Sequence, residues 1–336
     1  MSRITVLGSG AWGTAIALSL ASNPSHAVTL WSHRSEAAEE LQSARENRHF
    51  LPGFPFPATL TVTGDDIQAV LEAEILVCVV PSQFIRPTMA RISPYLHPRQ
   101  ILVSATKGIE DGTYLRMTEV IQSCLATDVL HLPVGALSGP SFAQEVAAGM
   151  PTAVTIAFPD PAVAAHIRQE FSSATLRLYT NDDLVGVELG GALKNVIAIA
   201  SGVASGLGLG HNSAAALITR GIAEITRLAV AAGGRRETLA GLSGIGDLVL
   251  TCTGSLSRNR TVGQELGRGR KLSEILTSLD GKVAEGVRTT RAALGLAQKL
   301  KVEMPITQQM ALILDEGKDP RSAMKELMLR PTRDED

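Results

Sequence analysis

A lysine in an unusually apolar setting is the first candidate for chemistry. Lys194 lies within residues 190–198, where every other side chain except that of Asn195 is small or aliphatic. Lysines are seldom buried without a partner or a task, and desolvation would lower the pKa of such an ammonium group toward neutrality. Because a group with a pKa near the working pH can both accept and donate a proton, we predict that Lys194 is a general acid–base. A lysine that extends along a helix edge to reach water is the alternative.

A second lysine and a carboxylate are further candidates. Lys107 follows residues 101–104, which predict a strand, and ligands of open α/β sheets gather beyond the carboxyl ends of strands. Asp247 is a single carboxylate in the Gly-rich stretch 244–248, where it could pair with a catalytic lysine or orient a hydroxyl group. A solvated loop lysine and a simple helix cap are the alternative interpretations. We predict that both residues contribute to catalysis beside Lys194.

A basic turn near the middle of the second half suits an anion. Ser257-Arg258-Asn259-Arg260 precedes a helical pattern, and serine is a preferred residue at helix N-caps. A phosphate group there would meet both the helix N-terminus and the planar guanidinium group of Arg258. A solvated basic turn is the alternative. The segment predicts a site for a small phosphorylated substrate.

The chain begins with a glycine pattern typical of dinucleotide binding. Gly8-Ser9-Gly10-Ala11-Trp12-Gly13 follows a predicted strand at 4–7 and opens a predicted helix at 13–21, which is the context that this otherwise weak motif requires. The glycines allow a tight turn, and the N–H groups at the helix start then face a pyrophosphate. A tight turn without a ligand is the alternative. We predict a nicotinamide dinucleotide at this turn.

The end of the second predicted strand, 28–31, bears on the choice of cofactor. NAD-binding proteins commonly carry an acid here that binds the ribose 2′-hydroxyl. This strand is followed instead by Ser32, His33 and Arg34, a set that suits a 2′-phosphate. Glu36 lies close enough in sequence to reach the ribose, and a solvated cluster at a helix start is the other alternative. We predict NADP or NAD as the cofactor, with NADPH favoured.

Short β-branched runs alternate with helical patterns over the first half of the chain. This alternation predicts parallel βαβ units in an open, doubly wound α/β sheet. The predicted strands are 4–7, 28–31, 75–80, 101–104, 134–137, 153–157 and 176–179, and the predicted helices between them include 13–21, 35–44, 115–125 and 161–171.

The pattern changes near Asp182. Ala-, Leu- and Gly-rich helical patterns replace the strands, which predicts an all-helical second domain. We place the boundary in the polar turn 180–183, where an Asx residue can cap the next helix, and expect domains at 1–181 and 182–336. The predicted helices are 184–207, 212–232, 258–266, 287–300 and 305–314.

Composition excludes several classes of function. The 336 residues carry 31 basic and 33 acidic side chains, a net charge of −2 that argues against a broad nucleic-acid surface. The three cysteines and seven histidines show no metal-binding spacing, so we predict no metal site. The N-terminus lacks a secretory signal, and we expect a cytoplasmic protein. Residues 184–209 are apolar enough to be tested as a membrane span, but Glu188 and Lys194 favour a buried helix without membrane insertion.

Seven segments, taken together and in this order, resemble the bacterial-type NAD(P)-dependent glycerol-3-phosphate dehydrogenases. They are residues 8–13, 106–108, 138–143, 191–196, 217–221, 246–248 and 257–260. The resemblance runs nearly end to end. It implies an N-terminal Rossmann-type sheet domain and an all-helical C-terminal domain, usually in a homodimer. It also implies reversible interconversion of sn-glycerol 3-phosphate and dihydroxyacetone phosphate, which feeds phospholipid synthesis.

The resemblance also implies roles for individual residues. Lys194 would accept the proton in the oxidation direction. The substrate would be lined by Lys107, Gly139, Ser141, Lys194, Asp247, Ser257, Arg258 and Asn259. The cofactor would be bound by Gly8, Gly10, Ala11, Trp12, Gly13, His33, Arg34, Lys107, Ala143, Arg258, Val283 and Glu285.

Three positions depart from the family pattern. Ala11 stands where the family often has Ser, and His211 and Ala214 stand where it often has an acidic and a basic residue. None of them touches the proposed proton path, although affinity for the ligands can change. The alternative functions are a related two-domain dehydrogenase acting on a 2-hydroxy acid or ketopantoate, and a cofactor-binding sensor without turnover.

Overall fold

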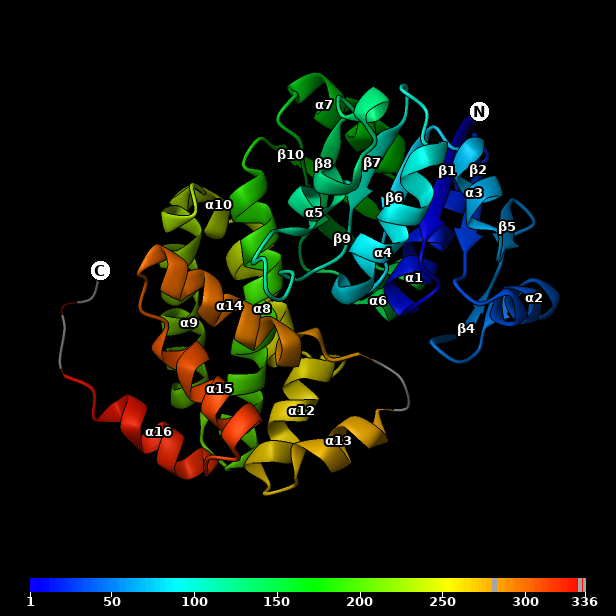
Figure 1. The fold of residues 1–336 in the computed structure, drawn as a ribbon. Helices are drawn as coiled ribbons and strands as arrows, with labels where there is room; N and C mark the ends of the chain where they lie inside the picture. Colours follow the sequence, from blue (N-terminus) through cyan, green and yellow to red (C-terminus); the bar gives the residue numbers. More distant parts are fainter. Residues whose placement is uncertain (280–282, 332–333, 335–336) are drawn as a thin grey trace.

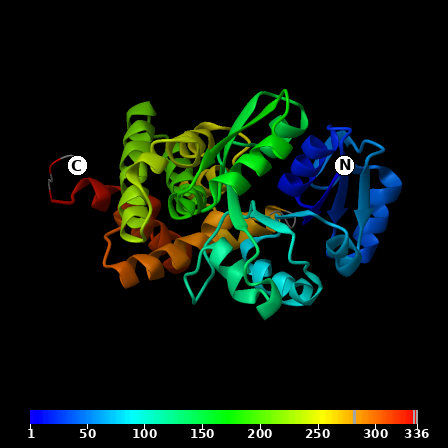
Figure 2. The same cartoon turned by 90° about the horizontal axis from the view of Figure 1, so that it is seen from above.

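The computed structural model describes residues 1–279, 283–331 and 334, and it consists of a sheet-based half followed by a helical half (Figure 1). Seen from above, the blue N-terminal strands and the red helix near the C-terminus lie at opposite ends of the molecule (Figure 2).

The described part of the first half contains an eight-stranded sheet in the order β10-β9-β8-β7-β6-β1-β2-β5. The strands are β1 (Ser2–Leu7), β2 (His26–Trp31), β5 (Leu60–Thr63), β6 (Ile75–Cys78), β7 (Ile101–Ser104), β8 (Val134–Ser138), β9 (Thr152–Ala157) and β10 (Leu176–Asn181). β1 lies between β2 and β6, so the chain switches direction across the sheet at β1. Such a switch point opens a crevice at the carboxyl ends of the strands, where ligands bind.

Helices cover both faces of this sheet. They are α1 (Ala11–Ala21), α2 (Ser35–Ala44), α3 (Asp66–Leu71), α4 (Ser82–Ile92), α5 (Met117–Cys124), α6 (Ala143–Ala147) and α7 (Pro161–Phe171). Val6 packs in a buried cluster with α1, α2 and α7, whereas its neighbour Leu7 packs in another with α3, α4 and α5. Since successive strand residues point to opposite faces, the predicted doubly wound sheet is confirmed.

The last two strands, β9 and β10, run against the expected direction. β9 pairs with β8 antiparallel, while its other neighbour, β10, is parallel to it. The connection from β8 to β9 contains only the five-residue helix α6. This helix is too short to run back along the full length of a strand, as a parallel crossover requires. The chain therefore turns back beside β8 instead of crossing over to start a parallel strand.

Several short elements were not predicted in the first half. Besides β5, α3, α4 and α6, they include the antiparallel pair β3 (Glu46–Asn47) and β4 (Leu51–Pro55), and the 3-10 turns Ser93–Tyr95 and Thr127–Val129. Most are too short for a hydrophobic period to be visible. α4 carries an internal proline, Pro87, which disguises its helical pattern.

The second half of the described chain is helical. Its helices are α8 (Leu184–Gly206), α9 (His211–Ala231), α10 (Arg236–Leu239), α11 (Asp247–Thr253), α12 (Arg258–Gly267), α13 (Leu272–Ser278), α14 (Glu285–Leu300), α15 (Pro305–Glu316) and α16 (Pro320–Met328), with a π-helical turn at Leu242–Gly246. The five predicted helices are all present. The shorter α10, α11, α13 and α16 were not predicted.

α8 forms the centre of the helical half, and glycines explain how closely its neighbours approach it. A Cβ atom added at Gly263 of α12 would lie 2.0 Å from the carbonyl oxygen of Ile199, and one added at Gly202 would lie 2.1 Å from that of Arg260. By length and composition α8 could cross a membrane, but 89% of its most apolar window is buried inside the protein. We interpret it as the core helix of this fold.

Candidate active site

Lys194 lies on α8, and its ammonium group is buried against α11. Only 8% of its side chain is exposed. Its Nζ atom donates hydrogen bonds to Oδ1 of Asp247 and to Oγ1 of Thr251, the latter at 2.8 Å. Thr251 uses its own hydroxyl hydrogen on the carbonyl oxygen of Asp247 at 2.6 Å, so a lone pair is left to face Lys194. The helical turn between Asp247 and Thr251 thus supplies two acceptors to one lysine.

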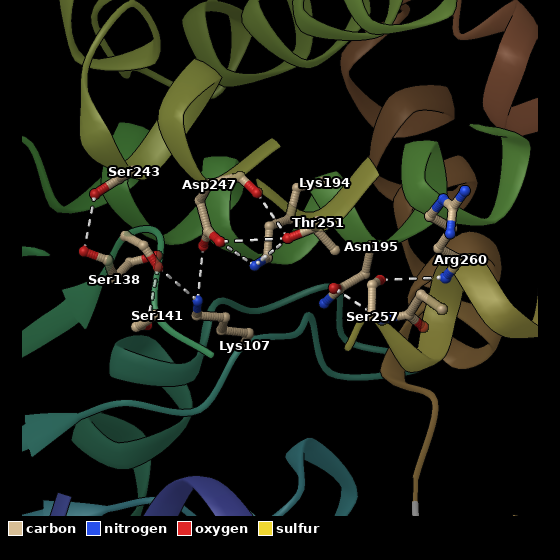
Figure 3. A network of polar contacts seen from close by, with 12 residues as sticks. Lys107, Ser138, Ser141, Lys194, Asn195, Ser243, Asp247, Thr251, Ser257 and Arg260 are labelled. Atoms are coloured by element: carbon tan, nitrogen blue, oxygen red, sulfur yellow. Dashed lines mark hydrogen bonds and ion pairs between the residues drawn. The ribbon is translucent and has the colours of Figure 1, made fainter. Parts of the chain in front are cut away.

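Lys107 reaches the same carboxylate from the other half of the molecule. It follows β7, and its Nζ donates to Oδ2 of Asp247 at 2.7 Å and to the carbonyl oxygen of Gly139 at 3.2 Å. Asp247 is fully buried. Figure 3 shows the two ammonium groups on different oxygens of this one carboxylate. The three residues predicted as catalytic therefore form a single cluster, although 87 residues separate Lys107 from Lys194 and 53 separate Lys194 from Asp247.

The surroundings of Lys194 make its ammonium group easy to deprotonate. Burial, above all, and the positive charge of Lys107 lower the pKa of Lys194, which falls from 10.5 to about 7. The negative charge of Asp247 raises the pKa and opposes part of this effect. A group that titrates near neutrality in a dry site has the property needed of a general acid–base.

Glycines on α8 allow the sheet edge to approach the lysine cluster. A Cβ atom at Gly191 would lie 2.3 Å from Oγ of Ser138, at the end of β8, and 3.8 Å from Cγ of Lys107. Gly139 has φ +142°, a conformation that favours glycine, and Oγ of Ser141 donates to its carbonyl oxygen at 3.0 Å. The turn after β8, which carries the predicted substrate residues Gly139 and Ser141, therefore borders the cluster.

The basic turn lies at the start of α12. Ser257 caps this helix by accepting a hydrogen bond from the N–H group of Arg260 at 3.2 Å. The side chain of Arg258 is open to solvent, yet enough protein surrounds its guanidinium group that desolvation lowers its pKa, against the opposing effect of the Glu285 charge. Among the described residues, the guanidinium group makes no hydrogen bond. Its donors are free for an anion.

Asn259 connects three helices beside this turn. Its side chain donates to Oδ1 of Asn195 at 2.9 Å and accepts from the N–H group of Gly286 at 3.0 Å. Asn195 directly follows Lys194 on α8, and Glu285 precedes Gly286 at the start of α14. The Asn259 side chain thereby fixes the basic turn relative to the helix turn that carries Lys194.

The glycine turn after β1 has the close contacts that its motif predicts. Gly8 has φ +123°, and a Cβ atom at Gly13 would lie 1.9 Å from the carbonyl oxygen of Gly8. A Cβ atom at Gly10, the N-cap of α1, would meet nothing within 4 Å, so the helix start is open. An open helix N-terminus at the switch point of the sheet can receive a pyrophosphate.

Comparisons with known proteins agree with this geometry. The model of the NAD-dependent glycerol-3-phosphate dehydrogenase N-terminus matches residues 3–164, and that of the C-terminus matches residues 183–325. The chain belongs to this family. A glycerol-3-phosphate dehydrogenase (NAD(P)+) of Acidobacterium capsulatum is 64% identical over 338 residues, with both chains fully covered. The corresponding Koribacter versatilis protein is 56% identical over 335 residues, covering 100% of this chain and 99% of its own.

A solved structure is also similar over its whole length. The glycerol-3-phosphate dehydrogenase of Coxiella burnetii has a TM-score of 0.93 and 41% identity, covering 98% of this chain and 99% of its own. The resemblance seen in the sequence motifs is therefore confirmed at the level of the family and the fold.

Three more residues expected to bind the cofactor, Ala11, Trp12 and Ala143, lie beside the glycine turn. Ala11 begins α1. Trp12 packs against α6 beside Ala143, and its indole N–H is buried without a hydrogen-bond partner among the described residues. Since buried donors are nearly always paired, this group is available to a ligand.

The end of β2 presents the residues expected to select the cofactor. His33 and Arg34 are exposed just beyond the strand, whereas Ser32 is buried and its Oγ lies 2.9 Å from Oγ of Ser9 in the glycine turn. Glu36 is exposed in the first turn of α2. The serine pair connects the strand end to the glycine turn.

Glu285 and Val283 lie where the helical half meets α4. Glu285 accepts a hydrogen bond from Oγ of Ser82, the first residue of α4, at 3.0 Å. Burial raises the pKa of Glu285, and the bond from Ser82 opposes this. Val283, two residues earlier, is partly buried. Glu285 thus contacts the sheet half of the molecule from the second half of the chain.

Four polar residues of the site were not predicted from the sequence. They are Thr251, Asn195, Ser82 and Ser138. Thr251 stands four residues after Asp247, so helical spacing alone could have indicated it. The others depend on which segments meet in the fold.

Proposed function

We propose that this chain interconverts sn-glycerol 3-phosphate and dihydroxyacetone phosphate with NADP or NAD, using Lys194 as its general acid–base. The observation that carries the proposal is the cluster in which Lys194 and Lys107 share the buried carboxylate of Asp247. Family membership supplies the activity, and this geometry supplies the roles of the residues.

The residues of the cluster suit proton transfer at a secondary alcohol. In the oxidation direction, unprotonated Lys194 accepts the proton of the C2 hydroxyl group as the hydride leaves the same carbon. In the reverse direction, its ammonium form returns that proton to the carbonyl oxygen. Asp247 and Thr251 hold the Nζ atom in place. Lys107 places a second positive charge near the substrate C2 oxygen, which becomes negative in the transition state. This charge lowers the free-energy barrier to hydride transfer.

The residues at the glycine turn fit a nicotinamide dinucleotide, which supplies the hydride donor or acceptor when bound. The close-packed Gly8 and Gly13 leave the helix start at Gly10 open to a pyrophosphate. We propose that the cofactor is bound by these residues and by Ala11, Trp12, His33, Arg34, Lys107, Ala143, Arg258, Val283 and Glu285. The exposed His33 and Arg34, with no acid at the tip of β2, favour NADPH.

The phosphate of the substrate is assigned to the start of α12. Arg258 offers a guanidinium group with unused donors, and the helix start after Ser257 adds its dipole. Asn259, Gly139 and Ser141 complete the proposed lining together with Lys107, Lys194 and Asp247. Binding energy from the phosphate, which is remote from the reacting carbon, can position that carbon for hydride transfer.

We further propose two domains at 1–181 and 182–336, a cytoplasmic homodimer, and supply of glycerol 3-phosphate to phospholipid synthesis. The domain boundary is supported by the side chain of Asp183, which caps α8 by accepting from the N–H group of Gly186 at 2.8 Å. The dimer, the compartment and the pathway rest on the family resemblance.

A spectrophotometric assay separates this function from its alternatives. NADPH should be consumed with dihydroxyacetone phosphate and hardly at all with ketopantoate, a 2-keto acid or plain dihydroxyacetone. Equal rates with an unphosphorylated substrate would contradict the substrate assignment. Cofactor binding without turnover of any of them would favour the sensor.

A further inference from the structure

A buried carboxylate outside the lysine cluster joins the two halves of the molecule. Glu188 lies on α8, six residues before Lys194, and its side chain is 5% exposed. Its oxygens accept hydrogen bonds from the N–H group of Thr118 at 2.8 Å, from Oγ1 of Thr118 at 2.6 Å and from Nη1 of Arg116 at 2.5 Å. These partners lie at the start of α5, on the sheet side. The proposed proton transfer does not use Glu188.

The partners of Glu188 end the segment that carries Lys107. We call residues 107–116 the lysine loop. The loop is closed on itself by an antiparallel bridge between Ile109 and Arg116 and by a hydrogen bond from the N–H group of Glu110 to the carbonyl oxygen of Leu115 at 2.9 Å. Arg116 is therefore paired with Ile109, which lies only two positions after Lys107. A contact that holds Arg116 in place also restricts the position of Lys107.

Two other side chains of the lysine loop, those of Ile109 and Tyr114, pack against the helical half. Ile109 is 4% exposed and belongs to the buried cluster of the helical half. The ring of Tyr114 occupies the space above Gly295 of α14, where a Cβ atom would lie 2.2 Å from the ring. The loop thus spans the junction between the halves, with Lys107 at its first residue and the Glu188 contact at its last.

Glu188 also lies on the side of α8 that Lys107 approaches. Gly191 follows Glu188 by three residues, so the two share a helix face. The position of a Cβ atom at Gly191 lies 3.8 Å from Cγ of Lys107. One helix thus holds the loop end through Glu188, passes the stem of Lys107 at Gly191 and carries Lys194.

We propose that Glu188 is a positioning residue that fixes Lys107, through Arg116 and Thr118, at its distance from Lys194 and Asp247. This inference rests on the proposed roles of the two lysines. Without the Glu188 carboxylate, the end of the lysine loop loses its hydrogen bonds to α8, so Ile109 and Tyr114 are left to hold the loop against the helical half and Lys107 is positioned less firmly.

The withdrawal of Lys107 has a defined electrostatic consequence. The charged groups that act on Lys194 are Asp247, which raises its pKa, and Lys107, which lowers it; the buried thiol of Cys252 lies nearby and is held neutral, because burial raises its pKa to about 12. If Lys107 moves away, Asp247 pairs with Lys194 alone, and the pKa of Lys194 rises.

A direct effect of the Glu188 charge would have the opposite sign. Glu188 faces Arg116 and Glu119 of the sheet half. Removing its negative charge leaves Arg116 paired with Glu119 alone, and the loss of a nearby negative charge would lower the pKa of Lys194 through space. The direction of the shift therefore separates positioning from a direct field.

The test measures the pH dependence of dihydroxyacetone phosphate reduction in Glu188→Gln and in a matched control. The control is Glu224→Gln, because Glu224 on α9 is 1% exposed and also accepts three hydrogen bonds, from the N–H groups of Ile306 and Thr307 and from Oγ1 of Thr307. These bonds join α9 to α15, away from the lysines. Both variants should lower the melting temperature.

Only Glu188→Gln should move the midpoint of the pH profile upward, with kcat/KM reduced roughly 10- to 100-fold by misplacement of Lys107. Thr118→Ser, which keeps the hydroxyl donor, should behave as the wild type. Thr118→Val, which removes one donor, should show a smaller upward shift and serves as the test if Glu188→Gln does not fold.

An unchanged midpoint, a downward shift or an equal shift in Glu224→Gln would overturn the positioning role. The Lys194→Met enzyme shows whether the proposed function itself has failed. If the same midpoint persists without Lys194, the midpoint does not belong to that residue, and both proposals fall. If it disappears there but is insensitive to Glu188, only the positioning role falls.

Discussion

Replacement of Lys194 by Met keeps the length of the side chain and removes its titratable nitrogen. At pH 7 a lysine with the ordinary pKa of 10.5 is unprotonated in roughly one molecule in 3,000, whereas one with a pKa of about 7 is unprotonated in about half. The environment of Lys194 thus raises the supply of the proton-accepting form by about a thousandfold. General acid–base catalysis is typically worth about 10²–10⁴-fold. We therefore expect kcat of Lys194→Met to fall by that range in both directions.

The pH profile supplies the sign of this prediction. Oxidation of glycerol 3-phosphate needs unprotonated Lys194, so its rate should rise as the pH increases through about 7. Reduction of dihydroxyacetone phosphate needs the ammonium form, so its rate should fall over the same interval. Both changes should disappear in Lys194→Met.

The assay follows NADPH absorbance in both directions, and cofactor affinity is measured separately by fluorescence titration. Cofactor affinity should be unchanged, because Lys194 contacts α11 and not the glycine turn. A near-normal kcat at neutral pH in Lys194→Met, or the same pH midpoint with and without the lysine, would refute the role assigned to it.

Three further substitutions test the remaining assignments. Arg34→Asp should repel a 2′-phosphate and lower the NADPH-to-NADH ratio of kcat/KM about 10- to 100-fold, since a charged hydrogen bond is worth about 1.5–3 kcal/mol; an unchanged ratio would contradict the proposed cofactor site. Arg258→Lys keeps the charge but loses the planar fork, so it should raise KM for dihydroxyacetone phosphate while plain dihydroxyacetone, already a very poor substrate, changes little. NADPH affinity must be measured in the same variant. Equal effects on kcat/KM for dihydroxyacetone phosphate and dihydroxyacetone would show that Arg258 does not bind the phosphate group. Gly263→Ala would bring a methyl group to 2.0 Å from the carbonyl oxygen of Ile199 and should destabilise the fold by about 1–3 kcal/mol; an unchanged melting temperature would refute this close packing of α8 and α12.

The lysine cluster shows how far the sequence can predict the site. The apolar setting of Lys194 indicated its burial, and the position of Lys107 after a strand indicated the ligand edge of the sheet. Neither pattern could indicate that both would meet Asp247, because contacts across 53 and 140 residues depend on how the halves pack. Thr251 was within reach of sequence reasoning, since it stands one helical turn from Asp247.

The fold shows the same limit. The β-branched runs predicted β8 and β9 as strands, but alternation within a strand carries no information about its direction. Their antiparallel pairing depends on the short connection through α6, whose five residues show no visible period. Likewise, Glu188 was recognised as a polar residue within an apolar helix, while its partners Arg116 and Thr118, 72 and 70 residues away, were not.

The arrangement of two lysines around one carboxylate supports the proposal that Lys194 is the lysine that exchanges the proton. A single lysine beside Asp247 would be held in its charged form, because the attraction of the pair opposes deprotonation. With Lys107 on the other oxygen, the cluster carries a net charge of +1 inside the protein, and repulsion between the ammonium groups favours loss of one proton. Lys194 is 8% exposed and Lys107 16%, so the desolvation cost of charge is greater at Lys194. Because Lys107 reaches Asp247 from the sheet half, the contacts that join the two halves also maintain the sharing of this carboxylate on which the proposed role of Lys194 depends.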